Sequence, residues 1–341
     1  MKKYLIVCLL ALGCAWAQAG VGLAELPGLK GDGPVTVYYP SANPDRPLQR
    51  GPFALNLDWQ GRPVRGNGRL VVISHGSGGA PWVHADLARA LVDAGFVVAL
   101  PEHRGDNYKD PSHPGPESWK LRPAEVSRAI DAVAHDARFA PLLSFDKVGM
   151  YGMSAGGHTA LVLAGGRWSP ALFARHCEAH IAQDFPACVG LLTRLKGNFF
   201  DPVKEWMAVA VIRRRFDDAT WSAHQDPRIQ AVVAGVPFAA DFDTASLARP
   251  RVPLALVTAG RDKWLAPQFH SGPILKACTT CEHIADLPTA GHGALMSPPP
   301  PLDKLGAIAS DLMGDPPGFD RSQLPEVDRK IAAFLRAHLL P

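Results

Sequence analysis

The chain has 341 residues, of which 47% are hydrophobic and 20% charged, so its composition excludes a disordered or fibrous protein. Its formal net charge is only +3, and the basic run Arg213–Arg215 is followed at once by Asp217 and Asp218. We interpret this run as a solvated helix face, so charge gives no reason to expect a nucleic-acid partner. The length fits one large α/β domain.

Residues 1–19 have the pattern of a secretory signal. Two lysines precede an apolar run over 4–12, and small residues follow at Ala15, Ala17 and Ala19. We expect cleavage after Ala17 or Ala19 and a periplasmic or secreted protein. Its net charge would be +1, because the signal carries both lysines away and no acid.

The mature domain is then residues 20–341. The apolar run over 4–12 is too short to cross a bilayer, so we expect no transmembrane segment. A lipoprotein site at Cys14, within Leu-Gly-Cys, is the alternative to simple cleavage.

Four cysteines follow the signal, and an exported protein tends to oxidise them. Their short separations favour the pairs Cys177–Cys188 and Cys278–Cys281 among three possible pairings. A redox motif or half a zinc site is the alternative for the second pair, but no second C-x-x-C accompanies it. The sequence leaves the oligomeric state open.

The first third of the chain predicts the start of a parallel sheet. Residues 35–39 alternate like a strand, a proline-rich loop covers 40–52, and residues 53–69 suggest an edge hairpin. The continuous apolar run 70–74 is typical of a strand buried on both faces, and it leads into His75-Gly-Ser-Gly-Gly79.

The alternation of helix and strand then begins. A helix over 83–93 ends before Gly95, a strand follows over 96–100, and a second helix covers 124–137. Between them the loop 101–123 is long enough to suggest a functional loop or lid. This order predicts a parallel sheet with right-handed crossovers.

The stretch 148–161 reads as a short strand, a tight turn and a helix. Its frame Gly152-Met-Ser-Ala-Gly156 has the G-x-S-x-G pattern, in which the serine sits on a strained strand-to-helix turn with its hydroxyl exposed. The two glycines are needed because a Cβ there would collide with the neighbouring strand or helix. We therefore predict Ser154 as a nucleophile.

Between residues 165 and 228 the alternation stops, and we predict an inserted helical cap. Its main helix, about 202–216, begins with a proline and carries one apolar stripe: Val203, Trp206, Met207, Ala210 and Val211. An ordinary packing helix is the alternative.

Strands resume at 231–236, 254–258 and 284–287. The prolines of 298–301 should lie extended on the surface, and a last helix over 328–339 should pack on the sheet. The predicted fold is therefore an α/β-hydrolase fold, with helices on both faces of a mostly parallel sheet.

A serine hydroxyl needs a general base and a group that holds the base. In this fold the partners follow the serine in the order acid, then histidine, each after a strand. Asp262 follows the strand 254–258, and His292 follows the strand 284–287. We predict Ser154, Asp262 and His292 as the catalytic residues.

Other residues compete for these roles. Asp241 or Asp243 could be the acid, and His270 or His283 the base. His158, one helical turn after Ser154, is interpreted as a packing or capping residue.

Attack on a carbonyl also needs donors for the oxyanion. We predict the backbone N–H groups of Ala155 and Ser77, with His75 shaping the turn before Ser77. Trp82, Met153 and Trp264 lie beside these groups in the sequence and are candidate substrate contacts, with plain core packing as the alternative for the two tryptophans.

Several segments resemble the predicted dienelactone hydrolases, a family of α/β-hydrolases similar to platelet-activating-factor acetylhydrolase and bacterial polyester hydrolases. The resemblance rests on His75–Gly79, Gly95–Asn107, the serine turn, Asp226–Ala231 and Gly291–Gly293. It implies the same three catalytic residues and two oxyanion donors, and ester hydrolysis without a cofactor. True dienelactone hydrolases use a cysteine where this chain has Ser154, so the resemblance says little about the substrate.

The sequence thus predicts a serine esterase that acts on a small-molecule, lipid or polymer ester. A serine peptidase or amidase would use the same residues. A binding protein without catalysis is the alternative from another class.

Overall fold

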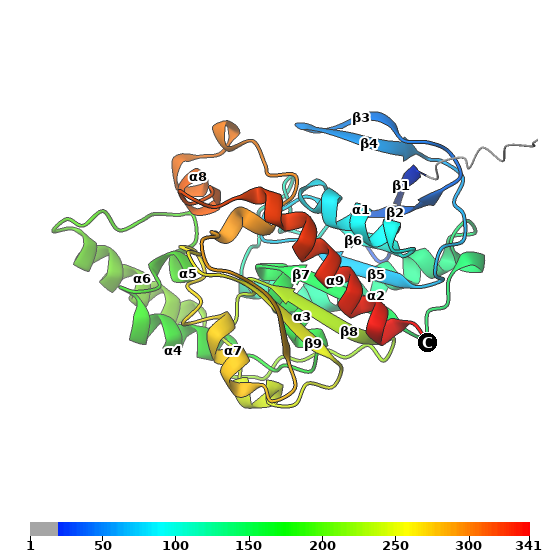
Figure 1. The fold of residues 1–341 in the computed structure, drawn as a ribbon. Helices are drawn as coiled ribbons and strands as arrows, with labels where there is room; N and C mark the ends of the chain where they lie inside the picture. The colour runs from blue at the N-terminus through cyan, green and yellow to red at the C-terminus, as the bar shows by residue number, and fades with distance from the viewer. Residues whose placement is uncertain (1–19) are drawn as a thin grey trace, which may run out of the picture.

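The computed structural model describes residues 20–341 and is built around one ten-stranded sheet (Figure 1). The strand order is β10-β9-β8-β7-β5-β6-β2-β1-β4-β3, and the six strands from β10 to β6 run parallel to one another. β2 pairs antiparallel with β6 and with β1. The architecture is therefore α/β with a mixed, mostly parallel sheet. The strands are β1 Gly20–Leu26, β2 Val35–Ser41, β3 Arg46–Arg50, β4 Phe53–Trp59, β5 Leu70–Ser74, β6 Val97–Pro101, β7 Val148–Met153, β8 Ile229–Gly235, β9 Leu254–Ala259 and β10 Glu282–Leu287.

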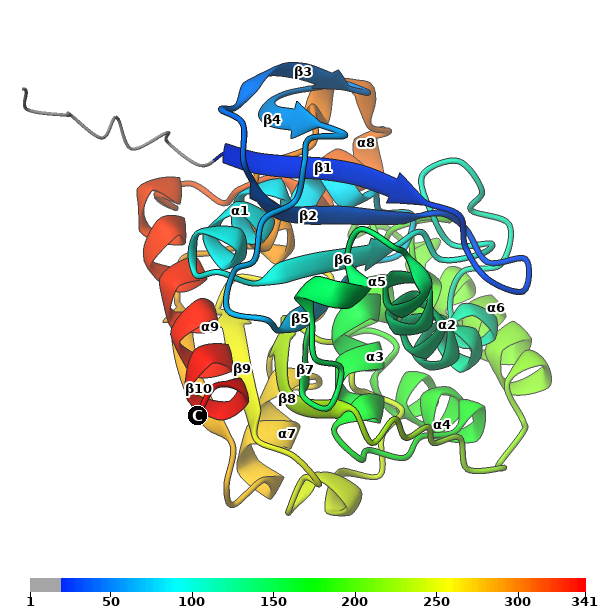
Figure 2. The ribbon, with the colours of Figure 1, turned by 90° about the vertical axis from the view of Figure 1, so that its right-hand side faces the viewer.

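Helices cover both faces of the parallel part of the sheet (Figure 2). On one face α1 packs against α9, and on the other α2 packs against α3. The central strands β5, β6 and β7 are buried along their whole length, so each face of the sheet contributes to its own apolar core. The longer helices are α1 Ala85–Asp93, α2 Pro116–His135, α3 Ala155–Leu163, α4 Pro170–His180, α6 Asp201–Arg215 and α9 Leu324–Leu339; the shorter ones are α5 Phe185–Val189, α7 Ser271–Ala277 and α8 Ala307–Met313.

Residues 165–228 lie between α3 and β8 in the chain and form the three helices α4, α5 and α6. As predicted, this stretch contributes no strand to the sheet. α4 packs on α6, and α6 lies at the edge of the molecule farthest from the N-terminal strands (Figure 1). The apolar stripe predicted on this helix faces outward, and only Ile212 among its large apolar side chains is buried.

The predicted loop 101–123 is wrong in its last third, because α2 already begins at Pro116 and contains Pro123. An internal proline costs roughly 3 kcal/mol, so Pro123 favours a helix that begins after it. Here the early turns bury Trp119 and Arg122, and this packing outweighs the cost.

The predicted loop 40–52 and hairpin 53–69 are also wrong in their bounds, because the hairpin lies earlier in the chain. The hairpin is formed by β3 and β4 and spans 46–59. Pro47 stands within β3, which is an edge strand, and proline is tolerated there because no further strand needs its missing N–H. β1 had no counterpart in the prediction.

Most other boundaries agree with the sequence to within a few residues. The proline run 298–301 is neither helix nor strand, as predicted. The two favoured disulfides, Cys177–Cys188 and Cys278–Cys281, are both formed. Among residues 20–341, no helix is both long and apolar enough to cross a membrane. The predicted signal and the lipoprotein alternative fall in residues 1–19, outside the described residues.

Candidate active site

Ser154 occupies the sharp turn between β7 and α3. Its φ is +59°, an unfavourable conformation for a residue with a side chain. A Cβ on Gly152 would lie 1.9 Å from the carbonyl oxygen of Gly156, and one on Gly156 would lie 1.9 Å from the carbonyl oxygen of Ser74. Both glycines are therefore required by close backbone approach, as the sequence predicted. The turn holds the serine hydroxyl above the end of the sheet.

The structure brings Ser154, His292 and Asp262 into one hydrogen-bonded row. Nε2 of His292 lies 2.9 Å from Ser154 Oγ, and its Nδ1 lies 2.7 Å from Asp262 Oδ2. The other oxygen of Asp262 accepts the backbone N–H groups of Trp264 and Leu265, each at 2.8 Å. The carboxylate is thus fixed in place, and it orients the imidazole toward the serine.

The competing acids and bases are engaged elsewhere. Asp241 Oδ2 lies 3.1 Å from Nε2 of buried His158, whose ring stacks on Trp119. Asp243 caps a short helix and pairs with Arg167. His158 is thus a packing residue, as we interpreted it.

The two other candidate histidines also lack any contact with Ser154. His270 bonds to Asp184 and to the backbone N–H of Ala239, and it directly precedes α7. His283 bonds to Thr258 on the neighbouring strand.

The loop 75–79 after β5 lies directly against Ser154. A Cβ on Gly76 would lie 3.3 Å from Ser154 Cβ, and Ser77 and Ala155 line the same cavity as Ser154. Ser77 Oγ donates to Asp106 Oδ1 at 2.5 Å, and the N–H of Gly78 donates to the same oxygen at 2.9 Å. The loop is therefore tied to Asp106.

Asp106 is in turn paired with Arg122 at 2.8 Å, and both side chains are fully buried. Arg122 also donates to the carbonyl oxygens of His75 and Gly76. Burial alone would raise the pKa of Asp106, but the guanidinium and the hydrogen bonds to the carboxylate outweigh burial and lower it. This ion pair holds the loop, and no motif in the sequence indicated it.

A second row of serine, histidine and acid lies beneath this loop. Ser74 Oγ is 2.7 Å from Nε2 of His103, and Nδ1 of His103 is 2.6 Å from Glu125 Oε2. All three residues are buried. Burial lowers the pKa of His103 far below its ordinary value, and nearby Arg122 lowers it further, whereas burial raises the pKa of Glu125. His103 is therefore neutral near pH 7.

Two apolar cavities meet at Ser154. Cavity A, about 340 Å³, extends from Ser154 toward the N- and C-terminal segments. Cavity B, about 770 Å³, extends toward α5 and α6. Ser77, Gly78, Leu191 and Trp264 line both of them. A ligand bound at Ser154 can thus place apolar groups on either side of the hydroxyl.

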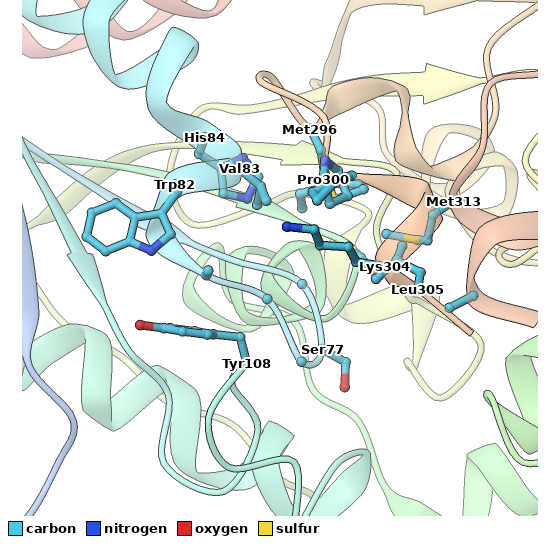
Figure 3. Close-up of a pocket in the computed structure, with 18 of the residues that line it drawn as sticks. Ser77, Trp82, Val83, His84, Tyr108, Met296, Pro300, Lys304, Leu305 and Met313 are labelled. Atoms are coloured by element: carbon cyan, nitrogen blue, oxygen red, sulfur yellow. The ribbon is translucent and has the colours of Figure 1, made fainter. Parts of the chain in front are cut away.

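The three candidate substrate contacts all line these cavities. Trp82 and Met153 line cavity A, and Trp264 stands between the cavities with its ring 5.2 Å from that of His292. Tyr108 and Trp82 lie on one side of cavity A, and Lys304 reaches into it from the opposite side (Figure 3).

Sequence reasoning missed the C-terminal wall of cavity A. This wall is formed by Met296, Pro300, Pro301, Lys304, Leu305, Ala309 and Met313. The proline run predicts only an extended surface segment, because its composition carries no signal for a binding site. Its position next to His292 in the chain was the one available hint.

Comparison with known proteins does not name this site. No protein-family model matches the chain, and a search of curated proteins finds no match.

Proposed function

We propose that the protein is an exported serine esterase with an α/β-hydrolase fold, related to the predicted dienelactone hydrolases that its sequence resembles. One observation carries the proposal: the row from Asp262 through His292 ends at a serine hydroxyl that lies between two apolar cavities. A hydroxyl bonded to an oriented imidazole is the arrangement that nucleophilic catalysis needs.

The reaction requires no group beyond this chain, the ester and water. Ser154 Oγ attacks the carbonyl carbon while His292 Nε2 takes the hydroxyl proton, and Asp262 stabilises the imidazolium. The tetrahedral intermediate collapses, its bond to the alcohol breaks, and the alcohol leaves with the proton from His292. Water then attacks the acyl group and gives its proton to the same nitrogen. Collapse of the second intermediate breaks the bond between the acyl carbon and Ser154 Oγ, which takes the proton back from His292, and the acid is released.

The negative oxygen of each intermediate would be bound by the N–H groups of Ala155 and Ser77. Ala155 is the first residue of α3, so its N–H has no partner within the helix and lies at the positive end of the helix dipole. Asp106 and Arg122 fix the loop that carries Ser77. Loss of one such donor typically costs about 10²–10³ in rate.

Residues 165–228 would act as a cap over the site. Leu191, Met207 and Val211 come from this segment and line cavity B, so it would shape the binding of one side of the ester. Two disulfides favour an oxidising compartment, which agrees with export by the N-terminal signal.

Covalent labelling tests the proposal. A fluorophosphonate should label wild-type protein at Ser154, and Ser154→Ala should abolish labelling and lower hydrolysis of a p-nitrophenyl ester by at least about 10³-fold. Ser74→Ala is the matched control, because Ser74 also bonds to a histidine but is buried, and labelling should persist in it. Unchanged turnover in Ser154→Ala would refute the mechanism. A wild-type protein that resists labelling would be a binding member of the fold.

Ester and amide hydrolysis use the same residues, so a matched pair of substrates must separate them. We expect a p-nitrophenyl ester to be cleaved far faster than the anilide of the same acid. A preference for the anilide would identify a peptidase or amidase instead.

A further inference from the structure

The outer side of residues 191–211 exposes an unusual amount of apolar surface. Leu192, Phe199 and Trp206 are 89%, 80% and 71% exposed. We call the whole set the apolar face: Leu191, Leu192, Phe199, Phe200, Val203, Trp206, Met207 and Val211. Contiguous apolar patches are uncommon on proteins that have no partner, so this face is expected to be covered in the functional state.

Basic residues alternate along the chain with the residues of the apolar face, and two of them carry unpaired charge among residues 20–341. Residues 191–218 contain six basic and four acidic residues, and Arg194 and Lys204 pair with Asp311 and Asp201. Lys196 and Arg214 form no ion pair with any residue in the described range 20–341. Arg213 and Arg215 have surface partners, Glu178 and Glu117, in pairs that contribute little to stability and can exchange. The partner should therefore be apolar and negatively charged.

These charges argue against a second copy of the chain as the partner. A two-fold contact would place the same surface on both sides, and the basic residues of one copy would then face those of the other. A helix with exposed tryptophan, phenylalanine and valine and with flanking lysine and arginine is instead typical of a segment that lies in the interface of a membrane.

The apolar face is continuous with the site. Leu191, Leu192, Met207 and Val211 belong to the face and also line cavity B, which reaches Ser154. A lipid surface in contact with the face would thus lie at the mouth of this cavity.

We propose that residues 191–216 dock the protein on anionic phospholipid bilayers and that esters held in the bilayer enter cavity B from there. The docking itself does not depend on catalysis, whereas the entry of substrate rests on the proposed esterase function. The apolar side chains would enter the boundary of the acyl chains, and the basic residues would contact phosphate and other acidic headgroups.

Co-sedimentation with vesicles tests the docking. Wild-type protein should sediment with vesicles of phosphatidylcholine and phosphatidylglycerol at least tenfold more strongly than with phosphatidylcholine alone, and salt should weaken this binding. Phe199→Ser/Val203→Ser/Trp206→Ser should bind at least tenfold more weakly. Lys196→Gln/Arg214→Gln should lose most of the preference for anionic vesicles. None of these five residues lines either cavity, so hydrolysis of a dissolved short-chain ester should not change.

Trp59→Ser is the matched control, because Trp59 is an exposed tryptophan on β4, far from α6, and this variant should bind like wild type (Figure 1). The proposal is overturned if wild-type protein sediments with neither kind of vesicle. It is also overturned by a dimer in light scattering that the triple variant converts to a monomer. Because Ser154→Ala should dock normally, failure of docking and failure of the esterase proposal are separate results.

Discussion

Two rows of serine, histidine and acid lie close together in this protein, and only one of them has access to a ligand. Ser154–His292–Asp262 and Ser74–His103–Glu125 share the same order of hydrogen bonds, with distances of 2.6 to 2.9 Å. Ser154 lines two cavities at a strained turn with φ of +59°, whereas Ser74 ends a regular buried strand. Hydrogen-bond geometry alone therefore does not identify a nucleophile. What distinguishes the two serines is access to a cavity and the backbone conformation at the serine.

The largest expected difference between the rows lies in their histidines. His292→Gln removes the proposed general base and should lower kcat/KM for a p-nitrophenyl ester by about 10³–10⁵-fold. His103→Gln should change kcat/KM by less than tenfold while lowering the free energy of unfolding, because it disturbs a buried hydrogen-bonded chain. Steady-state kinetics and urea unfolding of both variants test this. A similar loss of activity in the two variants would mean that the buried row takes part in the reaction.

Asp262 and the competing candidate Asp241 should also differ in their effect on activity. Asp262→Asn leaves a side chain of nearly the same shape but disfavours the imidazole tautomer needed at Ser154, so kcat should fall by about 10²–10⁴-fold. Asp241→Asn is the control, since Asp241 bonds to His158 rather than to His292. Its kcat should stay within about threefold of wild type. A large loss in Asp241→Asn instead would reassign the acid.

A variant of Asp106 tests how the loop 75–79, which carries the proposed oxyanion donor Ser77, is held. Asp106→Asn removes the partner of the buried Arg122 and weakens two hydrogen bonds to the loop, so we expect kcat to fall about 10–100-fold with little change in KM. Ser77→Ala keeps the backbone N–H and loses only the side-chain bond to Asp106. It should cost less than tenfold, and a larger loss than in Asp106→Asn would contradict this role of the ion pair.

The sequence predicted the accessible row and could not predict the buried one, for physical reasons. The turn at Ser154 forces glycines at fixed spacing, and Asp262 and His292 follow recognisable strands, so chain order carries the information. Ser74, His103 and Glu125 meet only through tertiary packing, and no spacing rule links them. The same holds for Asp106 and Arg122.

Elements were predictable where an apolar pattern alone decides them, as for the strands that frame Ser154. The early start of α2 depends on burial of Trp119 and Arg122, which no local pattern reveals. The apolar stripe of α6 indicated a helix face but not what covers it. The direction of that face and the C-terminal wall of cavity A became visible only in the structure.

The smallest expected effect is a pH dependence that belongs to the buried row. Burial keeps His103 neutral in the folded protein, whereas in the unfolded chain it takes up a proton below its ordinary pKa of 6.5. The unfolded state then binds more protons, so the contribution of His103 to the free energy of unfolding decreases as the pH falls below 6.5. One such group contributes a slope of at most about 1.4 kcal/mol per pH unit.

His103→Gln should remove this contribution, and urea unfolding at pH 5, 6 and 7 measures it as a smaller slope than in wild type. His75 and His84 are also buried with lowered pKa values, so part of the slope should persist in the variant. Burial raises the pKa of Glu125, so above pH 4.5 its contribution to the free energy of unfolding decreases as the pH rises. This opposite contribution is present in wild type and in the variant. Equal slopes would mean that His103 carries a proton inside the fold. The buried row would then be an ion pair with Glu125, and its difference from the row at Ser154 would rest on access alone.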